Sequence, residues 1–389
     1  MNLPVGNWNY PTRVRFGAGR ISELAAVCRE LDISHPMLLT DPGLVELPMF
    51  TTARQWLAES GLPVSVFSDL KPNPVGANLE AAVAAYRAGG CDGVIAFGGG
   101  SALDVGKTVG LMAGQTRPLW DFEDVGDNYL RADPAGIAPI IAVPTTAGTG
   151  SELGRATVLI NEQEERKVIL FHPRMMPAQV IMDPELTVGL PPNITAWTGM
   201  DALAHCLEAY CAPGYHPLAD GVALEGMRLV HENLPIAYAR GSDLEARGNM
   251  LAAAGMGATA FQKGLGAIHS LSHPVGAHYD THHGLTNAVF MPYVLAFNRP
   301  AVERRIAAAA RYLALPEPDF DGFLAWILSL RENLGIPHTL EGIGVDDRDI
   351  DRIAEEAEHD PSTPGNPVPV TAKELKQIFL DALEGRLPE

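Results

Sequence analysis

The chain has 389 residues, of which 47% are hydrophobic and 19% charged, and its formal net charge at pH 7 is -19. This length favours two domains, because a single hydrophobic core seldom grows beyond roughly 250–300 residues. So acidic a chain is unsuited to neutralising the phosphates of a nucleic acid or to binding an anionic membrane, so we expect neither partner.

Four scattered cysteines without CxxC spacing indicate reduced thiols rather than a disulfide framework. The N-terminal residues show neither a basic leader nor an apolar signal segment. No uncharged apolar run approaches the roughly 20 residues that span a bilayer. We therefore expect a soluble, cytoplasmic protein.

Residues 1–185 alternate short apolar runs with longer amphipathic segments. The pattern predicts strands at residues 12–16, 36–40, 63–67, 93–97 and 138–143. It predicts helices at residues 21–31, 51–60 and 79–86. Such alternation is typical of a parallel sheet covered by helices, so we predict an α/β domain over residues 1–185.

From residue 186 to 389 the apolar residues repeat at helical spacing, without a convincing β-branched strand. The pattern predicts helices at residues 220–234, 244–261, 302–313, 321–334 and 372–383. A turn-rich loop, residues 360–369, precedes the last of them. The second domain is therefore predicted to be all-α.

A glycine-rich turn at residues 98–107 (GGGSALDVGK) follows an apolar strand and opens a helix. Glycines let the backbone approach a diphosphate, and the helix N-terminus offers it free N–H groups. A P-loop is rejected, because Ser101 stands where that pattern requires its first glycine. The standard Rossmann glycine register is not met either. We predict a diphosphate-binding turn, with a tight turn that binds nothing as the alternative.

Two other turns suit a dinucleotide. Residues 144–152 (PTTAGTGSE) offer hydroxyls and glycines to a ribose, a diphosphate or a nicotinamide amide, unless they only cap a helix. Asp41 ends the strand at residues 36–40, where a carboxylate would bind a ribose 2′-hydroxyl and repel a 2′-phosphate. This favours NAD over NADP, although residues 41–43 are also consistent with an ordinary turn.

One carboxylate and three histidines have the spacing of a metal site. Asp201 and His205 are four residues apart in a helical run, so their side chains share a face. His269 follows in a second segment, and His283 lies fourteen residues beyond it. Such a set can enclose a divalent cation and leave room for a substrate. Each histidine alone is more often a core residue, so the prediction depends on the set.

Four motifs together resemble the iron-containing (group III) alcohol dehydrogenase family. They are residues 98–107, residues 144–152, residues 201–208 (DALAHCLE) and the series His269, His273, His283. The resemblance extends over nearly the whole chain, including residues 363–366 (TPGN). It implies a Rossmann-like dinucleotide-binding domain at residues 1–185 and a helical metal-binding domain at residues 186–389, in a dehydroquinate synthase-like architecture.

The resemblance also implies an activity and its residues. Hydride would pass between NAD(H) and a primary alcohol or aldehyde, with a divalent metal, Fe²⁺ or alternatively Zn²⁺, polarising the substrate oxygen. The implied metal ligands are Asp201, His205, His269 and His283. The implied cofactor-binding residues are Asp41, Gly98, Gly99, Gly100, Ser101, Asp104, Thr145, Thr146 and Lys167. His273 is implied as a catalytic residue in proton relay.

Three alternatives stay open. Lys263 lies six residues before His269 and would reach a substrate carboxylate in a hydroxyacid or semialdehyde dehydrogenase, unless it is a surface lysine. A lyase of the dehydroquinate synthase kind would use NAD and a metal without net oxidation. A non-catalytic metal-binding protein would leave both phosphate-type turns unexplained. A strand-like N-terminus is suited to pairing with another subunit, so we expect a homo-oligomer, most simply a dimer.

Overall fold

A computed structural model describes residues 6–8, 12–164 and 166–387. By its internal contacts the chain divides into two compact units. The N-terminal unit comprises the residues up to Thr146 together with Gly150–Gly189. The C-terminal unit comprises Ala147–Thr149 and the residues from Leu190 onward.

A seven-stranded sheet forms the centre of the N-terminal unit, in the order β1-β2-β9-β6-β5-β3-β4. Its strands are β1 (Gly6–Trp8), β2 (Val14–Phe16), β3 (Pro36–Leu39), β4 (Ser65–Phe67), β5 (Gly93–Gly98), β6 (Ile140–Pro144) and β9 (Gln179–Met182). All neighbours pair in parallel except β1, which is antiparallel to β2. The predicted parallel sheet is confirmed, whereas β9 was not predicted.

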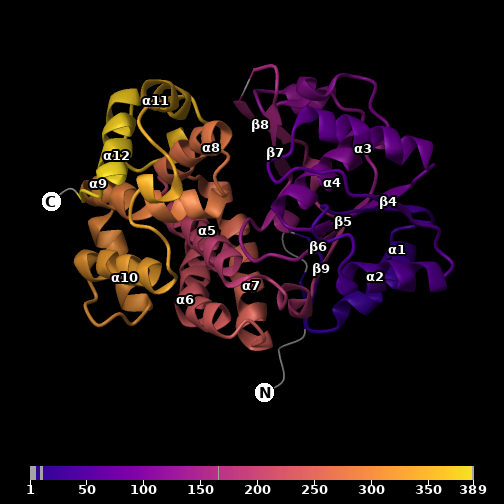
Figure 1. Cartoon of the computed structure of the whole chain (residues 1–389), viewed down its shortest axis with the longest axis horizontal. Helices are drawn as coiled ribbons and strands as arrows, with labels where there is room; N and C mark the ends of the chain where they lie inside the picture. The colour runs from indigo at the N-terminus through magenta and orange to yellow at the C-terminus, as the bar shows by residue number, and fades with distance from the viewer. Residues whose placement is uncertain (1–5, 9–11, 165, 388–389) are drawn as a thin grey trace. The chain divides into compact units, whose positions relative to one another are not determined.

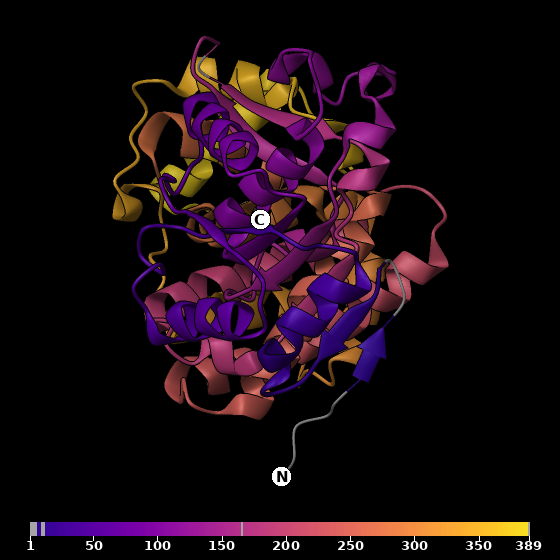
Figure 2. The same cartoon turned by 90° about the vertical axis from the view of Figure 1, so that its right-hand side faces the viewer.

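Helices cover both faces of this sheet (Figure 1). They are α1 (Leu24–Glu30), α2 (Pro48–Glu59), α3 (Gly76–Ala88) and α4 (Gly100–Met112). Met37 and Leu39 of β3 share a core cluster with α3 and α4, whereas Leu38 shares one with α1 and α2. Successive strand residues point to opposite faces, so a strand buried on both faces needs a continuous apolar run. Figure 2 shows the two helix layers on either side of the strands.

A separate antiparallel hairpin, β7 (Ala156–Asn161) and β8 (Arg166–Phe171), was not predicted. Leu159 of β7 and Val168 and Leu170 of β8 are buried in the same core cluster as α3 and α4. Their neighbours along each strand are more exposed, which gives the alternating burial of a strand with one solvent-exposed face. The hairpin therefore extends the layer above one face of the sheet.

The regular structure described in the C-terminal unit is helical, which confirms the all-α prediction. Its helices are α5 (Pro192–Cys211), α6 (Pro217–Ala239), α7 (Leu244–Ala260), α8 (Ala267–Tyr279), α9 (His283–Tyr312), α10 (Phe320–Asn333), α11 (Ile350–Glu358) and α12 (Ala372–Glu384). Helix α5 packs against α6, α7 and α9 and is buried along most of its length. Among the described residues, no helix is both long and apolar enough to cross a membrane.

Candidate metal centre and cofactor turns

The four predicted metal ligands meet in the C-terminal unit. Asp201 and His205 lie one turn apart on α5, His269 lies in the first turn of α8, and His283 opens α9. One ligand atom of each side chain lies within 4.8 Å of those of the other three. Ligand atoms bound about 2.1 Å from one tetrahedral ion lie roughly 3.4 Å from one another, so a modest contraction of this cluster lets all four bind a single ion.

Burial of the cluster suits metal binding. Asp201, His205 and His269 are almost fully buried, whereas the His283 side chain is 25% exposed and leaves one side of the cluster accessible. Burial lowers the pKa of His205 to about 4, although the Asp201 carboxylate opposes this shift. His205 is therefore neutral at pH 7, the form whose nitrogen lone pair binds a metal.

A glycine allows α9 to approach α5 closely. A Cβ atom at Gly284 would lie 2.2 Å from the carbonyl oxygen of Trp197 and 3.0 Å from the Cβ of Asp201. Any side chain there would push the start of α9, and His283 with it, away from Asp201. The glycine directly after His283 is therefore part of how the sequence builds the cluster.

Asn287, one turn after His283 on α9, contacts three of the four predicted ligands. Its Nδ2 is 2.8 Å from Asp201 Oδ1, 3.1 Å from His283 Nε2 and 3.3 Å from His269 Nε2. Three acceptor atoms therefore face one point. A carboxylate with imidazole nitrogens is the ligand chemistry of Fe²⁺ and Zn²⁺, so this set fits the metal that the sequence predicts.

His273, the predicted catalytic residue, lies beside the cluster and is held by a carboxylate. Its Nδ1 is 2.8 Å from Asp360 Oδ2, and its ring stacks on His283 with the ring centres 5.4 Å apart. Burial alone would raise the pKa of Asp360, but the contact with His273 and the Ser362 N–H lowers it below its usual value. An ionised Asp360 therefore accepts a hydrogen bond from the Nδ1–H group of His273.

Glu208, one further turn along α5, supports another ligand. Its Oε2 lies 2.5 Å from His269 Nδ1, and its Oε1 accepts a hydrogen bond of 2.7 Å from the Ile268 N–H. Sequence reasoning missed Glu208, Asn287 and Asp360. Glu208 continues the helical spacing from Asp201 and His205, and Asn287 lies four residues after His283, so both had a signal. Asp360 lies 87 residues from His273 and had none.

The predicted cofactor turns gather at one edge of the sheet. Along the chain, β3 leads outward to β4, and β5 then returns to the other side of β3. The carboxyl ends of β3 and β5 thus flank the point where strand order reverses, which is where such sheets bind ligands. Asp41 follows β3, and a Cβ at Gly98 would lie 3.5 Å from its Oδ2. The structure therefore brings Asp41 and the glycine turn together.

The second turn joins the same edge. Gly98 pairs in register with Pro144, and the Thr145 N–H donates to the Gly98 carbonyl at 3.0 Å. A Cβ at Gly99 would lie 3.3 Å from Thr146 Cγ2, so glycine lets the two turns approach each other. Helix α4 begins at Gly100 and directs the N–H groups of its first turn toward this edge.

Polar side chains of the glycine-rich segment are engaged within the protein. Ser101 donates its hydroxyl hydrogen to the Pro72 carbonyl. Asp104 accepts hydrogen bonds from the Ser151 hydroxyl and, at 2.9 Å, from the Val158 N–H. Lys107 is buried, with Nζ 2.9 Å from the Ser151 carbonyl oxygen. A lysine turned inward cannot reach a phosphate, which is a second reason against a P-loop.

Two predicted residues lie elsewhere. Lys167 is on β8, paired in register with Ile160, and so belongs to the hairpin rather than to the central strands.

Lys263 is not a surface lysine, because its side chain is 2% exposed. Its Nζ lies 2.7 Å from Asp220 Oδ1 and donates to the Tyr210 carbonyl at 3.1 Å. The predicted contact with a substrate carboxylate is therefore corrected: this ammonium already has a carboxylate partner.

Comparisons with known proteins identify the class that this site and fold define. A family model described as "Iron-containing alcohol dehydrogenase" matches residues 11–184. One described as "Fe-containing alcohol dehydrogenase family, C-terminal" matches residues 195–383. The chain belongs to the iron-containing alcohol dehydrogenase family. The predicted class of enzyme, an NAD-dependent, metal-dependent alcohol oxidoreductase, is confirmed, and the family match favours it over a lyase.

Individual relatives align over nearly their full length. The chain is 38% identical to a 4-hydroxybutyrate dehydrogenase of Cupriavidus necator, over 95% of this chain and 98% of that protein. A crystal structure of a 1,3-propanediol oxidoreductase superposes with a TM-score of 0.91 at 33% identity, covering 98% and 100% of the two chains. A sulfoacetaldehyde reductase from Bifidobacterium kashiwanohense in complex with NAD⁺ has a TM-score of 0.86 at 29% identity, covering 98% and 99%.

Proposed function

We propose that Asp201, His205, His269 and His283 bind one divalent cation, Fe²⁺ or Zn²⁺, at which a primary alcohol is oxidised or an aldehyde reduced. The observation that carries this proposal is the convergence of four buried or half-buried ligand atoms within 4.8 Å of one another. When bound, the cation supplies Lewis acidity toward the substrate oxygen, and NAD supplies the hydride acceptor. The accessible side of the cluster, at His283, admits the substrate.

The residues at the carboxyl ends of β3, β5 and β6 bind the dinucleotide in this proposal. The N–H groups at Gly99, Gly100 and Ser101 bind the diphosphate, because they begin α4. Thr145 and Thr146 line the neighbouring turn. Asp104 acts by fixing Ser151 and β7, the contacts that it makes. Lys167 keeps a cofactor role only as an expectation from the family resemblance.

Asp41 selects NAD in this proposal. Its Oδ1 accepts a hydrogen bond of 2.9 Å from the Gly43 N–H, which fixes the carboxylate beside Gly98. A fixed carboxylate accepts hydrogen bonds from a ribose hydroxyl and repels a 2′-phosphate. Steady-state rates with NAD⁺ and NADP⁺ test this selection directly.

His273 accepts and passes on a proton. Because Nδ1–H donates a hydrogen bond to Asp360, the lone pair of the neutral ring is on Nε2, which can receive a proton. We expect His273→Ala to lower kcat about 10²-fold and to change the pH profile of the reaction. An unchanged rate and pH profile would show that His273 has no part in the proton relay.

A second candidate substrate is a hydroxyacid or semialdehyde, and the identity to a 4-hydroxybutyrate dehydrogenase favours it. Lys263 would not bind the carboxylate of such a substrate, because its ammonium group is already paired with Asp220. Rates should be compared for butanol and 4-hydroxybutyrate with NAD⁺, and for butyraldehyde and succinic semialdehyde with NADH. Higher kcat/KM for the uncharged pair supports the primary alcohol, and the reverse result supports the hydroxyacid. No NAD-linked turnover of either pair would overturn the proposal.

We also propose a cytoplasmic homodimer that binds small molecules and neither nucleic acid nor membrane. The acidity of the chain supports the last two points. The edge strand β1 supports self-association, because an edge strand offers unpaired backbone groups to a second chain. Light scattering on the purified protein measures the mass: about twice 41.6 kDa agrees with a dimer, and a single-chain mass does not.

A further inference from the structure

Helix α8 begins with backbone N–H groups that residues from other segments satisfy. Its N-cap, Gly266, has no side chain to cap it. The Ala267 N–H donates to Asn366 Oδ1 at 3.2 Å, and the Ile268 N–H donates to Glu208 Oε1 at 2.7 Å. A Cβ at Gly266 would lie 2.9 Å and 3.1 Å from these two oxygens, so glycine is required for both caps.

The same Glu208 carboxylate also holds the ring of His269. Its second oxygen, Oε2, lies 2.5 Å from His269 Nδ1. Glu208 thus fixes both the backbone beside His269 and the orientation of its imidazole. Glu208 is 6% exposed, and both of its carboxylate oxygens have a hydrogen-bond partner, as buried polar atoms require.

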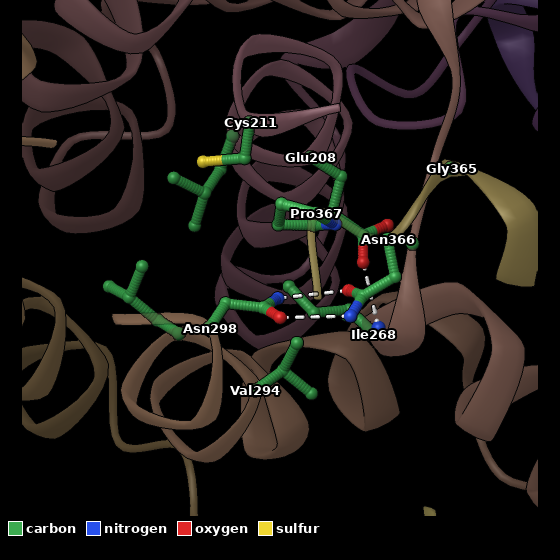
Figure 3. A pocket seen from close by; sticks show the side chains of 11 residues that line it. Glu208, Cys211, Ile268, Val294, Asn298, Gly365, Asn366 and Pro367 are labelled. Atoms are coloured by element: carbon green, nitrogen blue, oxygen red, sulfur yellow. Dashed lines mark hydrogen bonds between the residues drawn. The ribbon is translucent and has the colours of Figure 1, made fainter. Parts of the chain in front are cut away.

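The surroundings leave Glu208 little freedom to move. Glu208 and Ile268 line a cavity of about 20 Å³. Figure 3 shows them beside the reciprocal amide pair of Asn298 and Asn366. These two amides donate to each other at 2.9 Å and 2.8 Å. The cavity has room for about one water molecule, so it leaves the carboxylate little space in which to move away from these contacts.

The contact with Glu208 determines which nitrogen of His269 faces the metal ligands. The carboxylate accepts a hydrogen bond from Nδ1–H, so the proton stays on Nδ1 and the lone pair is on Nε2. Nε2 is the nitrogen on the side of the cluster, 3.3 Å from Asn287 Nδ2. We propose that Glu208 is a positioning residue, which holds His269 in the tautomer and orientation that bind the cation. This inference rests on the metal site proposed above.

A second carboxylate–histidine pair provides a matched control. Asp360 holds His273 through Nδ1 at 2.8 Å, the same chemistry on a histidine outside the ligand set. Replacing either carboxylate by its amide conserves shape and removes one charge. Of the two carboxylates, Glu208 hydrogen-bonds directly to a metal ligand and Asp360 does not, so the two variants should differ in metal affinity.

The test measures the dissociation constant of Zn²⁺ for the wild-type protein, Glu208→Gln and Asp360→Asn, by competition with a chromophoric chelator. We expect affinity about 10- to 100-fold weaker for Glu208→Gln and within about threefold of wild type for Asp360→Asn. Equal affinity of wild type and Glu208→Gln overturns the positioning role, and so does an equal loss in Asp360→Asn. If the wild-type protein binds no Zn²⁺, the proposed metal site itself is wrong.

A measurement on the wild-type protein keeps the inference testable if Glu208→Gln fails to fold. The ring nitrogens of His269 can be assigned by NMR of the Zn²⁺-loaded, ¹⁵N-histidine-labelled protein, with His269→Ala to identify the signals. We expect a proton on Nδ1 and zinc on Nε2. Zinc bound through Nδ1 would contradict the proposal.

Discussion

The metal cluster and the cofactor turns use the chain in different ways. In the C-terminal unit, four side chains of specific chemistry converge from α5, α8 and α9. In the N-terminal unit, Ser101, Asp104 and Lys107 bond to protein groups, and mainly backbone N–H groups and Asp41 remain for a ligand. A metal requires particular side chains, whereas a diphosphate requires a backbone shape, so the two sites should respond differently to substitution.

The largest expected effect, on metal binding and on kcat/KM, comes from a substitution in the metal cluster. Asp201→Asn removes the only carboxylate among the four ligands, so metal binding should be lost and kcat/KM should fall about 10³-fold or more, since Lewis acidity contributes several kcal/mol. Metal content and NADH formation at 340 nm measure both. His278→Ala serves as control, because His278 bonds to Glu356 outside the ligand set. Comparable losses in the two variants would contradict the assignment.

In the N-terminal unit, a change at Glu152 is expected to affect stability more than a change at Asp41 affects cofactor choice. Glu152 is buried near Lys107. Burial raises the pKa of this carboxyl from 4.5 to about 7. Between these values the folded state binds more protons than the unfolded state, so stability falls as the pH rises. The pKa difference corresponds to on the order of 3 kcal/mol above pH 7.

Glu152→Gln should therefore unfold at a higher temperature than wild type at pH 8, and the difference should disappear below about pH 5. Thermal unfolding followed by circular dichroism across this range measures it. A difference that stays constant with pH would show that Glu152 is not the titrating group.

A smaller loss of stability and of metal affinity is expected from a substitution where α9 packs against α5. Gly284→Ala overpacks the contact with Trp197, so we expect a loss of about 1–3 kcal/mol in stability together with weaker metal binding. Gly221→Ala is the matched control, because a Cβ at this helical position meets no atom within 4 Å. That variant should be as stable as wild type or slightly more so. If Gly284→Ala binds metal normally, the close approach of α9 is not what places His283.

The smallest expected effect is on cofactor choice. Asp41→Ser removes a charge beside Gly98, so the ratio of kcat/KM for NAD⁺ to that for NADP⁺ should fall about tenfold, roughly 1.4 kcal/mol. Metal affinity should not change. An unaltered ratio would show that Asp41 forms only the turn at Gly43.

The sequence predicted the parts of both sites that local spacing specifies. Asp201 and His205 were expected on one helix face, and the strands that carry Asp41 and Gly98 were expected from their apolar runs. The hairpin β7–β8 was missed because its strands pack on a helix layer rather than in the main sheet. Asp360 and the ion pair of Lys263 with Asp220 were missed because contacts between segments distant in sequence leave no local pattern.

Titration of the metal-free protein with Fe²⁺ under anaerobic conditions, in the presence of NAD⁺ and a primary alcohol, tests the central claim most directly. We expect NADH formation to rise with added Fe²⁺ and to level off at one ion per chain, whereas Asp201→Asn stays inactive throughout. Full activity without metal, or saturation unaffected by Asp201→Asn, would contradict the account.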